Sequence, residues 1–358
     1  MNQKFWKNKK VLITGHTGFK GGWLTMILSI LGAKVYGIAL DPETKPNFFN
    51  LLNLKKYLAK DIRCNIENLQ SLNKEINKIK PDIVFHLAAQ SKVRDSYLNS
   101  LKTINSNMMG TANILEIFKN SNFIKSLLIT TTDKVYKNIN NKRHFKEEDE
   151  LGGDDIYSAS KSAAEILANA YYKSFFAKSK KRSIVCLRAG NVIGGGDWTK
   201  DRIIPDCVKA VKNKKPIILR NPKSIRPWQH VLEPLLGYVI TAEQMQNNKN
   251  DLDLALNFGP NKSNYKNVKI ITKKLISNLK EKNKIIIKKS NDNFYEKKYL
   301  YLNSNKAYKK LRWRPILNLE QTIKLTANWY LEYLKKQNLE KITIIQIKDY
   351  LNKYYAKK

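Results

Sequence analysis

Cysteine and histidine are scarce in this sequence. Its 358 residues include three cysteines (Cys64, Cys186 and Cys207), which lie far apart and form no CxxC pair. This pattern excludes a disulfide framework and a zinc ribbon. The four histidines show no HExxH or other ligand spacing. We therefore expect reduced thiols and no metal site.

Long hydrophobic runs are also missing. The best run, Leu24–Leu31, spans eight residues, whereas a membrane-spanning helix needs about 18 or more. The N-terminal MNQKFWKNKK leads straight into the strand-like VLITG, and we expect no signal peptide there. The expected location is the cytoplasm, without a membrane partner.

Acidic residues are few compared with basic ones. There are 30 Asp and Glu against 66 Lys and Arg, which gives a net charge of +36. Residues 261–358 hold 25 basic and 7 acidic residues, so +18 falls on that segment. Its lysines alternate with asparagine and isoleucine and lack an aromatic–basic RNA signature. We interpret them as a solvated surface and expect no specific nucleic-acid partner. The alternative, a protein that binds nucleic acid or a partner through this segment, predicts DNA or heparin binding that survives physiological salt.

The first half of the chain alternates short apolar runs with helical stretches. Apolar strands separated by helices indicate an α/β fold with a Rossmann-like, doubly wound parallel sheet. We assign residues 1–188 to this dinucleotide-binding domain. Residues 189–358, with Gly/Pro-rich loops such as GGGDW, RNPKSIRPW and NFGPN, are assigned mainly to a smaller substrate-binding region whose segments can cross back. The predicted strands are Lys10–Gly15, Lys34–Leu40, Asp82–Ala89, Ser126–Thr132 and Ser183–Val192, and the main helices Gly21–Gly32, Ser100–Lys119 and Ile156–Ala177.

A glycine-rich turn follows the first predicted strand. Gly15, Gly18 and Gly21 form G-x-x-G-x-x-G at the start of a helix. Glycine permits a tight turn and close approach of a pyrophosphate, and the helix N-terminus adds unpaired N–H groups. The turn predicts a dinucleotide site.

Two acidic positions follow this turn. Asp41 comes 20 residues after Gly21, just past the second predicted strand. A carboxylate there can bind a ribose 2′-hydroxyl and repel a 2′-phosphate, which favours NAD over NADP. Asp61 and Ile62 are candidates to receive the adenine, although a strand-end turn explains Asp61 equally well.

Tyr157 and Lys161 form Y-x-x-x-K at the start of a predicted helix. Residues four apart share one helix face. The phenol is a poor base at its reference pKa near ~10, and we expect the neighbouring ammonium to lower that pKa. Together with the glycine turn, the pair indicates hydride-transfer chemistry.

These motifs resemble the extended short-chain dehydrogenases/reductases. The matching stretches are TGHTGFKG, HLAAQS, NMMGT, TTDKVY, YSASK and RAGNVIGGGDW. Within that superfamily the chain is most similar to the group of CDP-glucose 4,6-dehydratases, through the lysine after TTD, GGGDW–DRIIPD and IRPWQHVLEPL. The resemblance implies NAD as cofactor, CDP-glucose as substrate, and a place in deoxysugar and cell-surface polysaccharide synthesis such as that of lipopolysaccharide O-antigen.

The resemblance also implies roles for individual residues. Tyr157 would take the proton of the sugar 4-hydroxyl, and Thr132 would bind the 4-oxygen. Asp133 would protonate the departing 6-hydroxyl. Lys134 would remove the C5 proton, which requires a depressed lysine pKa. The remaining candidates are Thr17, Phe19, Leu87, Ala88, Ala89 and Asn107 beside the cofactor, and Asn191, Arg202 and Arg226 at the substrate diphosphate.

Oligomeric state and base specificity are the least determined by the sequence. The resemblance implies a homodimer or higher homo-oligomer, formed through Ser100–Lys119 and the helix that carries Tyr157. A second reading is a dehydratase or epimerase acting on another nucleotide sugar, linked to dTDP, UDP or GDP, because motif spacing does not reveal which residues contact the base.

Overall fold

A seven-stranded parallel sheet forms the centre of the molecule. The structure, a computed structural model, describes residues 3–139, 142–179, 181–247, 252–288 and 299–356. The strand order is β11-β6-β5-β4-β1-β2-β3, and neighbouring strands pair in parallel throughout. The strands are β1 (Lys10–Thr14), β2 (Lys34–Ala39), β3 (Lys60–Arg63), β4 (Ile83–His86), β5 (Ser126–Thr130), β6 (Ser183–Ala189) and β11 (Ala255–Phe258).

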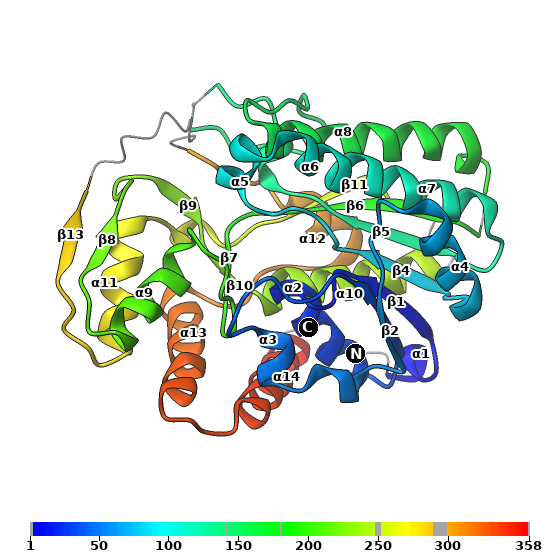
Figure 1. Cartoon of the computed structure of the whole chain (residues 1–358). Coiled ribbons are helices and arrows are strands. Elements are labelled where there is room, and N and C mark those ends of the chain that lie inside the picture. Colours follow the sequence, from blue (N-terminus) through cyan, green and yellow to red (C-terminus); the bar gives the residue numbers. More distant parts are fainter. Residues whose placement is uncertain (1–2, 140–141, 180, 248–251, 289–298, 357–358) are drawn as a thin grey trace.

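Helices cover both faces of this sheet (Figure 1). The helices α4, α7 and α8 bury apolar side chains with one face, and α2 and α10 with the other. Such two-sided cover is what near-continuous apolar strands require. The helices are α1 (Gln3–Trp6), α2 (Phe19–Ile30), α3 (Phe48–Leu51), α4 (Leu69–Ile79), α5 (Val93–Leu98), α6 (Ser100–Ile104), α7 (Gly110–Asn120), α8 (Ile156–Tyr171), α9 (Ile203–Lys212), α10 (Leu232–Gln246), α11 (Val268–Asn278), α12 (Asn305–Leu311), α13 (Leu319–Leu334) and α14 (Leu339–Ala356).

The C-terminal half adds three two-stranded sheets beside the main one. Their strands are β7 (Val192–Ile193) with β10 (Gln229–His230), β8 (Ile217–Leu219) with β13 (Ile285–Ile287), and β9 (Ile225–Pro227) with β12 (Tyr265–Asn267). Short 3₁₀ helices span Leu54–Tyr57, Asp133–Val135 and Lys262–Asn264, and π-helical turns span Asn105–Met109 and Tyr172–Phe176.

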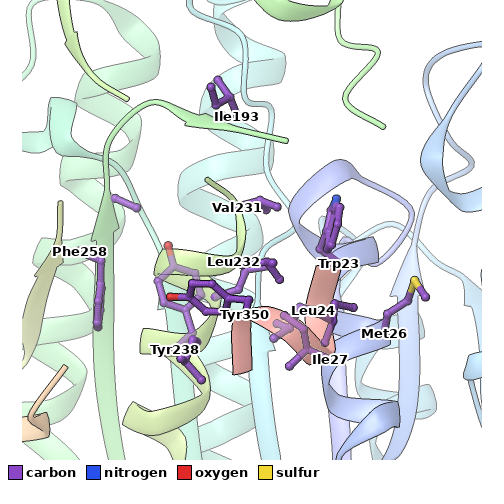
Figure 2. Close-up of a cluster of buried hydrophobic side chains, with 14 of the residues drawn as sticks. Trp23, Leu24, Met26, Ile27, Ile193, Val231, Leu232, Tyr238, Phe258 and Tyr350 are labelled. Carbon is purple, nitrogen blue, oxygen red and sulfur yellow. The ribbon is translucent and has the colours of Figure 1, made fainter. Parts of the chain in front are cut away.

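The larger core lies between the sheet and the C-terminal helices. Figure 2 shows Trp23 and Ile27 of α2 close to Leu232 and Tyr238 of α10, with Tyr350 of α14 in the same cluster. All five side chains are at most 2% exposed. The C-terminal helices therefore complete the core under the first half of the chain.

The doubly wound fold predicted from the sequence is confirmed. The five predicted strands occur, shortened by one to three residues at their C-terminal ends, and β4 also begins one residue later than predicted. The three main helices occur, with π-helical turns within the predicted ranges of the two longer ones. Two strands of the sheet were not predicted. The edge strand β3 contains one apolar residue, Ile62, and β11 includes Asn257 and Phe258 of a stretch expected to be a loop.

The strand order reverses direction between β1 and β4. Loops leave these neighbouring strands toward opposite faces of the sheet, and parallel sheets form a crevice at this point. Within the described residues, no helix is long and apolar enough to cross a membrane, and no cluster of three metal-ligating side chains is found.

Candidate active site

A cavity of about 320 Å³ opens at the carboxyl ends of the strands. It is lined by loops that follow β1, β2, β4 and β5 together with the start of α8 and the loop before α9. Twelve predicted site residues lie in its wall: Gly15, Thr17, Gly18, Phe19, Gly21, Asp41, Leu87, Ala88, Ala89, Tyr157, Lys161 and Arg202.

The glycine turn is packed too closely for side chains at two of its positions. Gly15 has a φ of +78°, and a Cβ there would lie 2.7 Å from the Ala88 nitrogen. A Cβ on Gly21 would lie 2.2 Å from the Gly15 carbonyl oxygen. The N-cap residue of α2, Gly18, makes no side-chain cap, so the first N–H groups of this helix remain for a ligand in the cavity.

Asp41 and Asp61 both form ion pairs with Arg63. The Asp41 carboxylate is 86% exposed and accepts a hydrogen bond from Arg63 Nε at 2.6 Å. Asp61 pairs with Arg63 and contacts His16 Nε2 at 2.7 Å. Arg63 thus reduces the charge with which Asp41 would repel a 2′-phosphate. Asp61 and Ile62 do not line the cavity, whose wall in this region is formed by Cys64, Asn65 and Ile66.

Asn107 supports the cavity from behind. Its side chain is fully buried. The amide oxygen accepts from Gln90 N, and the amide nitrogen donates to Gln90 O and Ser160 Oγ at 3.0 Å each. Asn107 therefore ties the loop after β4, which contains the wall residues Leu87–Ala89, to α8.

Tyr157 and Lys161 lie on one face of α8, and both are buried. Burial raises the pKa of Tyr157 to about 12, although a hydrogen bond with Thr132 and the charge of Arg202 lower it. Lys161 Nζ donates to the Thr130 carbonyl at 3.1 Å. The expected lowering of the phenol pKa by Lys161 is therefore wrong: burial outweighs the nearby charges, and the cation that opposes burial is Arg202. Burial lowers the pKa of Lys161 itself to about 8.

Asp133 follows the end of β5 and is 3% exposed. Thr132 Oγ1 donates to its Oδ1 at 3.1 Å, and its Oδ2 has no hydrogen-bond partner among the described residues. Burial raises the pKa of Asp133 against the opposing charges of Lys134, Arg226 and Lys20. An aspartic acid with a raised pKa can hold a proton to donate.

Lys134 lies on the 3₁₀ turn Asp133–Val135, which Thr132 caps. The strand ends at Thr130, so the alternation of side chains across a sheet no longer applies to Asp133 and Lys134. The turn therefore allows both to face one substrate, but Thr132, Asp133 and Lys134 are not among the residues that line the cavity.

One of the three predicted diphosphate ligands lines the cavity and two do not. Arg202 lines the cavity and pairs with Asp197 at 3.0 Å. Arg226, on β9, is 3% exposed and is one of the charges acting on Asp133. Asn191 precedes β7, and its carbonyl accepts from Gln229 N. Asn191 and Arg226 are not among the residues that line the cavity.

Sequence reasoning missed Lys20 in the glycine turn. Lys20 lines the cavity, and burial together with the charges of Arg202 and Lys161 lowers its pKa to about 8. It also attracts Asp133. A lysine inside G-x-x-G-x-x-G was the available signal, because it places a cation where a phosphate is expected.

Comparisons with known proteins assign the family. The GDP-mannose 4,6 dehydratase family model matches residues 12–326. The chain belongs to this family.

One relative in sequence and one solved structure with a similar fold match nearly the whole chain. It is 38% identical over 356 residues to the CDP-glucose 4,6-dehydratase of Salmonella typhimurium, covering 98% of this chain and 99% of that protein. The fold matches the dTDP-glucose 4,6-dehydratase of Bacillus anthracis in complex with NAD, with a TM-score of 0.75, 23% identity, and 94% and 99% of the two chains covered.

An epimerase structure is also similar in fold to this chain. The UDP-glucuronic acid 4-epimerase of Bacillus cereus, in complex with UDP-glucuronic acid and NAD, gives a TM-score of 0.76 at 23% identity, covering 91% of this chain and 99% of that one. Dehydratases and epimerases therefore share this architecture.

Proposed function

We propose that this chain is an NAD-dependent hydro-lyase that converts CDP-glucose into CDP-4-keto-6-deoxyglucose and water. The observation that carries the proposal is Asp133–Lys134 on one turn beside Tyr157, in a chain similar over 98% of its length to a CDP-glucose 4,6-dehydratase. An acid–base pair next to a Tyr–Lys pair suits oxidation followed by elimination at a single sugar.

The cavity fits a dinucleotide. Gly15 and Gly21 leave no room for Cβ atoms, and the uncapped start of α2 offers N–H groups to a diphosphate. The turn from Gly15 to Gly21 and the wall residues Leu87–Ala89 would hold NAD, with Asp41 at its ribose. NAD bound there would accept a hydride from C4 of the sugar and return it to C6.

The side chains would move the protons of the reaction. Tyr157 Oη takes the proton of the 4-hydroxyl, and Thr132 Oγ1 keeps the 4-oxygen in place. The resulting ketone acidifies C5–H, which Lys134 removes. Asp133, with its raised pKa, protonates the 6-oxygen so that it leaves as water. When the hydride reaches C6, Lys134 returns its proton to C5. Tyr157 then carries one proton more than at the start and Asp133 one fewer, and a proton passes through solvent from the phenol to the carboxylate before the next turnover.

Arg202 and Arg226 are proposed to bind the diphosphate, with Asn191 beside it. Guanidinium groups suit this contact because they can donate two parallel hydrogen bonds to one phosphate. Residues 1–188 would then hold NAD, and residues 189–358 would mainly bind the nucleotide sugar, although β11 lies in the central sheet.

We also propose a cytoplasmic homodimer that supplies deoxysugars to cell-surface polysaccharide. Leu98, Leu101 and Ile166 are 74%, 73% and 57% exposed. They belong to α5, α6 and α8, which pack together (Figure 1). Exposed apolar side chains on adjacent helices suit a second copy of the chain, and sedimentation of the purified protein would test the oligomeric state.

The substrate is tested with a panel of nucleoside-diphosphate glucoses, with the products read by mass. Loss of one water from CDP-glucose, and little from the dTDP, UDP and GDP forms, is the expected result. Water loss from another member in preference to CDP-glucose would keep the dehydratase chemistry and reject the substrate. Epimerisation without water loss would reject both.

A further inference from the structure

A buried ion pair lies behind the predicted catalytic residues. Glu165 of α8 and Arg188 of β6 are 4% and 3% exposed. Arg188 Nε donates to the two Glu165 oxygens at 3.0 and 2.9 Å, and Nη2 donates to Oε2 as well. Neither side chain lines the cavity of the candidate active site.

This pair joins the three segments that hold the predicted chemistry. Thr131 Oγ1 donates to Glu165 Oε1, while Lys161, one helical turn earlier, donates to the carbonyl of Thr130. Successive turns of α8 therefore hold successive residues at the end of β5, directly before Thr132 and Asp133. Arg188 ends this connection on β6, three residues before Asn191.

Arg188 also makes hydrogen bonds to groups other than Glu165, and these hold its guanidinium in place. Its Nη1 donates to Tyr136 Oη at 2.7 Å and to the Glu147 carbonyl at 3.2 Å. Tyr136 Oη in turn donates to Asn257 Oδ1 of β11 at 2.7 Å. The guanidinium cannot turn away from Glu165 without breaking these bonds.

We propose that Glu165, held by Arg188, is a positioning residue that orients the Thr132–Asp133 turn and places a carboxylate on the helix face that carries Lys161. The inference rests on the proposed function of the same site. Glu165 bonds the residue before the catalytic turn and shares a helix face with Lys161, so a change at Glu165 reaches both.

The charges around Lys161 make Glu165 its electrostatic partner. Glu165 raises the Lys161 pKa and thereby opposes burial. Cys186 of β6 faces Lys161 with a thiol whose pKa burial raises. His86 of β4 has a pKa of about 3 and is neutral. Lys20 of α2 is a cation like Lys161 and cannot serve as its counter-charge. Among the described residues facing Lys161, Glu165 supplies the carboxylate.

The first test compares Glu165→Gln with wild type in single turnovers with CDP-glucose, following reduced nicotinamide from pH 6 to pH 10. We expect the alkaline limb of the profile to move down by about one pH unit, because the ammonium loses its carboxylate. Glu165→Asp keeps the charge and should restore the limb. Tyr136→Phe is the matched control, because it removes a hydrogen bond of Arg188 but leaves the Glu165 carboxylate. It should keep the alkaline limb of wild type even if it unfolds at a lower temperature.

A second readout needs no substrate. The Lys161 pKa is lower in the folded protein than the 10.5 of an unfolded lysine, so its contribution to stability rises with pH between those two values. In Glu165→Gln this rise should begin at lower pH, measured by urea unfolding of the protein without NAD.

Thr131→Val keeps the proposal testable if Glu165→Gln does not fold. It removes only the hydroxyl that contacts Glu165, and water loss should slow about tenfold or more while the alkaline limb stays in place. A folded Glu165→Gln protein with a wild-type limb, or Thr131→Val with a wild-type rate, overturns the proposal. Wild type that forms no CDP-4-keto-6-deoxyglucose from CDP-glucose instead rejects the proposed function.

Discussion

Gly21→Ala is the sharpest test of the cofactor turn. The new Cβ would meet three backbone atoms, the Gly15 carbonyl oxygen at 2.2 Å and the Gly15 carbonyl carbon and His16 Cα at 2.8 Å each. Backbone atoms cannot rotate away, so the turn must shift by about 1 Å to reach ordinary contact. Overpacking of this kind costs about 1–3 kcal/mol, and the gain of about 1 kcal/mol in helix propensity from Gly to Ala offsets only part of it.

The shift should weaken NAD binding more than folding. Displacing the turn removes at least one N–H bond to a charged phosphate, worth about 1.5–3 kcal/mol, and the Kd for NAD should rise about tenfold to hundredfold. Calorimetric titration with NAD and thermal unfolding without it measure the two effects.

Gly18→Ala is the matched control for stability. Its Cβ would lie 3.3 Å from the same carbonyl oxygen, and its φ of −81° suits alanine. Alanine is a poorer N-cap than glycine, but it also reduces the conformational entropy of the unfolded chain, an effect of similar size and opposite sign. The free energy of unfolding without NAD should therefore stay within about 0.5 kcal/mol of wild type. If Gly21→Ala unfolds like this control and binds NAD with wild-type affinity, the reasoning from close packing is refuted.

Three further predictions concern the proposed chemistry and the effect of buried Lys161 on stability. Asp133→Asn should accumulate reduced nicotinamide in a single turnover and lose water at least ~100-fold more slowly; wild-type water loss would remove Asp133 from the mechanism. Lys134→Ala should bind CDP-glucose yet fail to exchange the C5 hydrogen with deuterated solvent, whereas Lys137→Ala, which changes a neighbouring lysine paired with Glu150, should exchange normally. Lys161→Met should lose activity and gain stability below pH 8, because the pKa of the buried ammonium is lowered to about 8; the difference from wild type should shrink as the pH rises toward 10.5.

The sequence predicts the central sheet well where strands are long and apolar. The runs at β1, β4, β5 and β6 are buried on both faces, and such strands appear as near-continuous hydrophobic segments. The edge strand β3 carries Ile62 between charged residues. Strand β11 depends on pairing with β6, where Ala255 lies beside Cys186, 69 residues earlier in the chain. Local pattern contains no information on a partner that distant.

In the candidate site, too, residues in local motifs were predicted and residues with distant partners were not. Motif residues such as Gly15, Gly21 and Tyr157 were found because each lies in a local spacing that has a physical meaning. Arg63, which pairs with Asp41, and Glu165, which pairs with Arg188, were not found because their partners lie 22 and 23 residues away and across the fold. Electrostatic partners of this kind are set by tertiary packing.

The transfer of one hydride from C4 to C6 is the central claim of the proposed mechanism. CDP-glucose carrying deuterium at C4 tests it directly, with the product analysed by mass and by the position of the label. The account predicts a 4-keto-6-deoxy product that carries the deuterium at C6, with no reduced nicotinamide accumulating in solution. Deuterium recovered in free reduced nicotinamide, with none at C6, would contradict it.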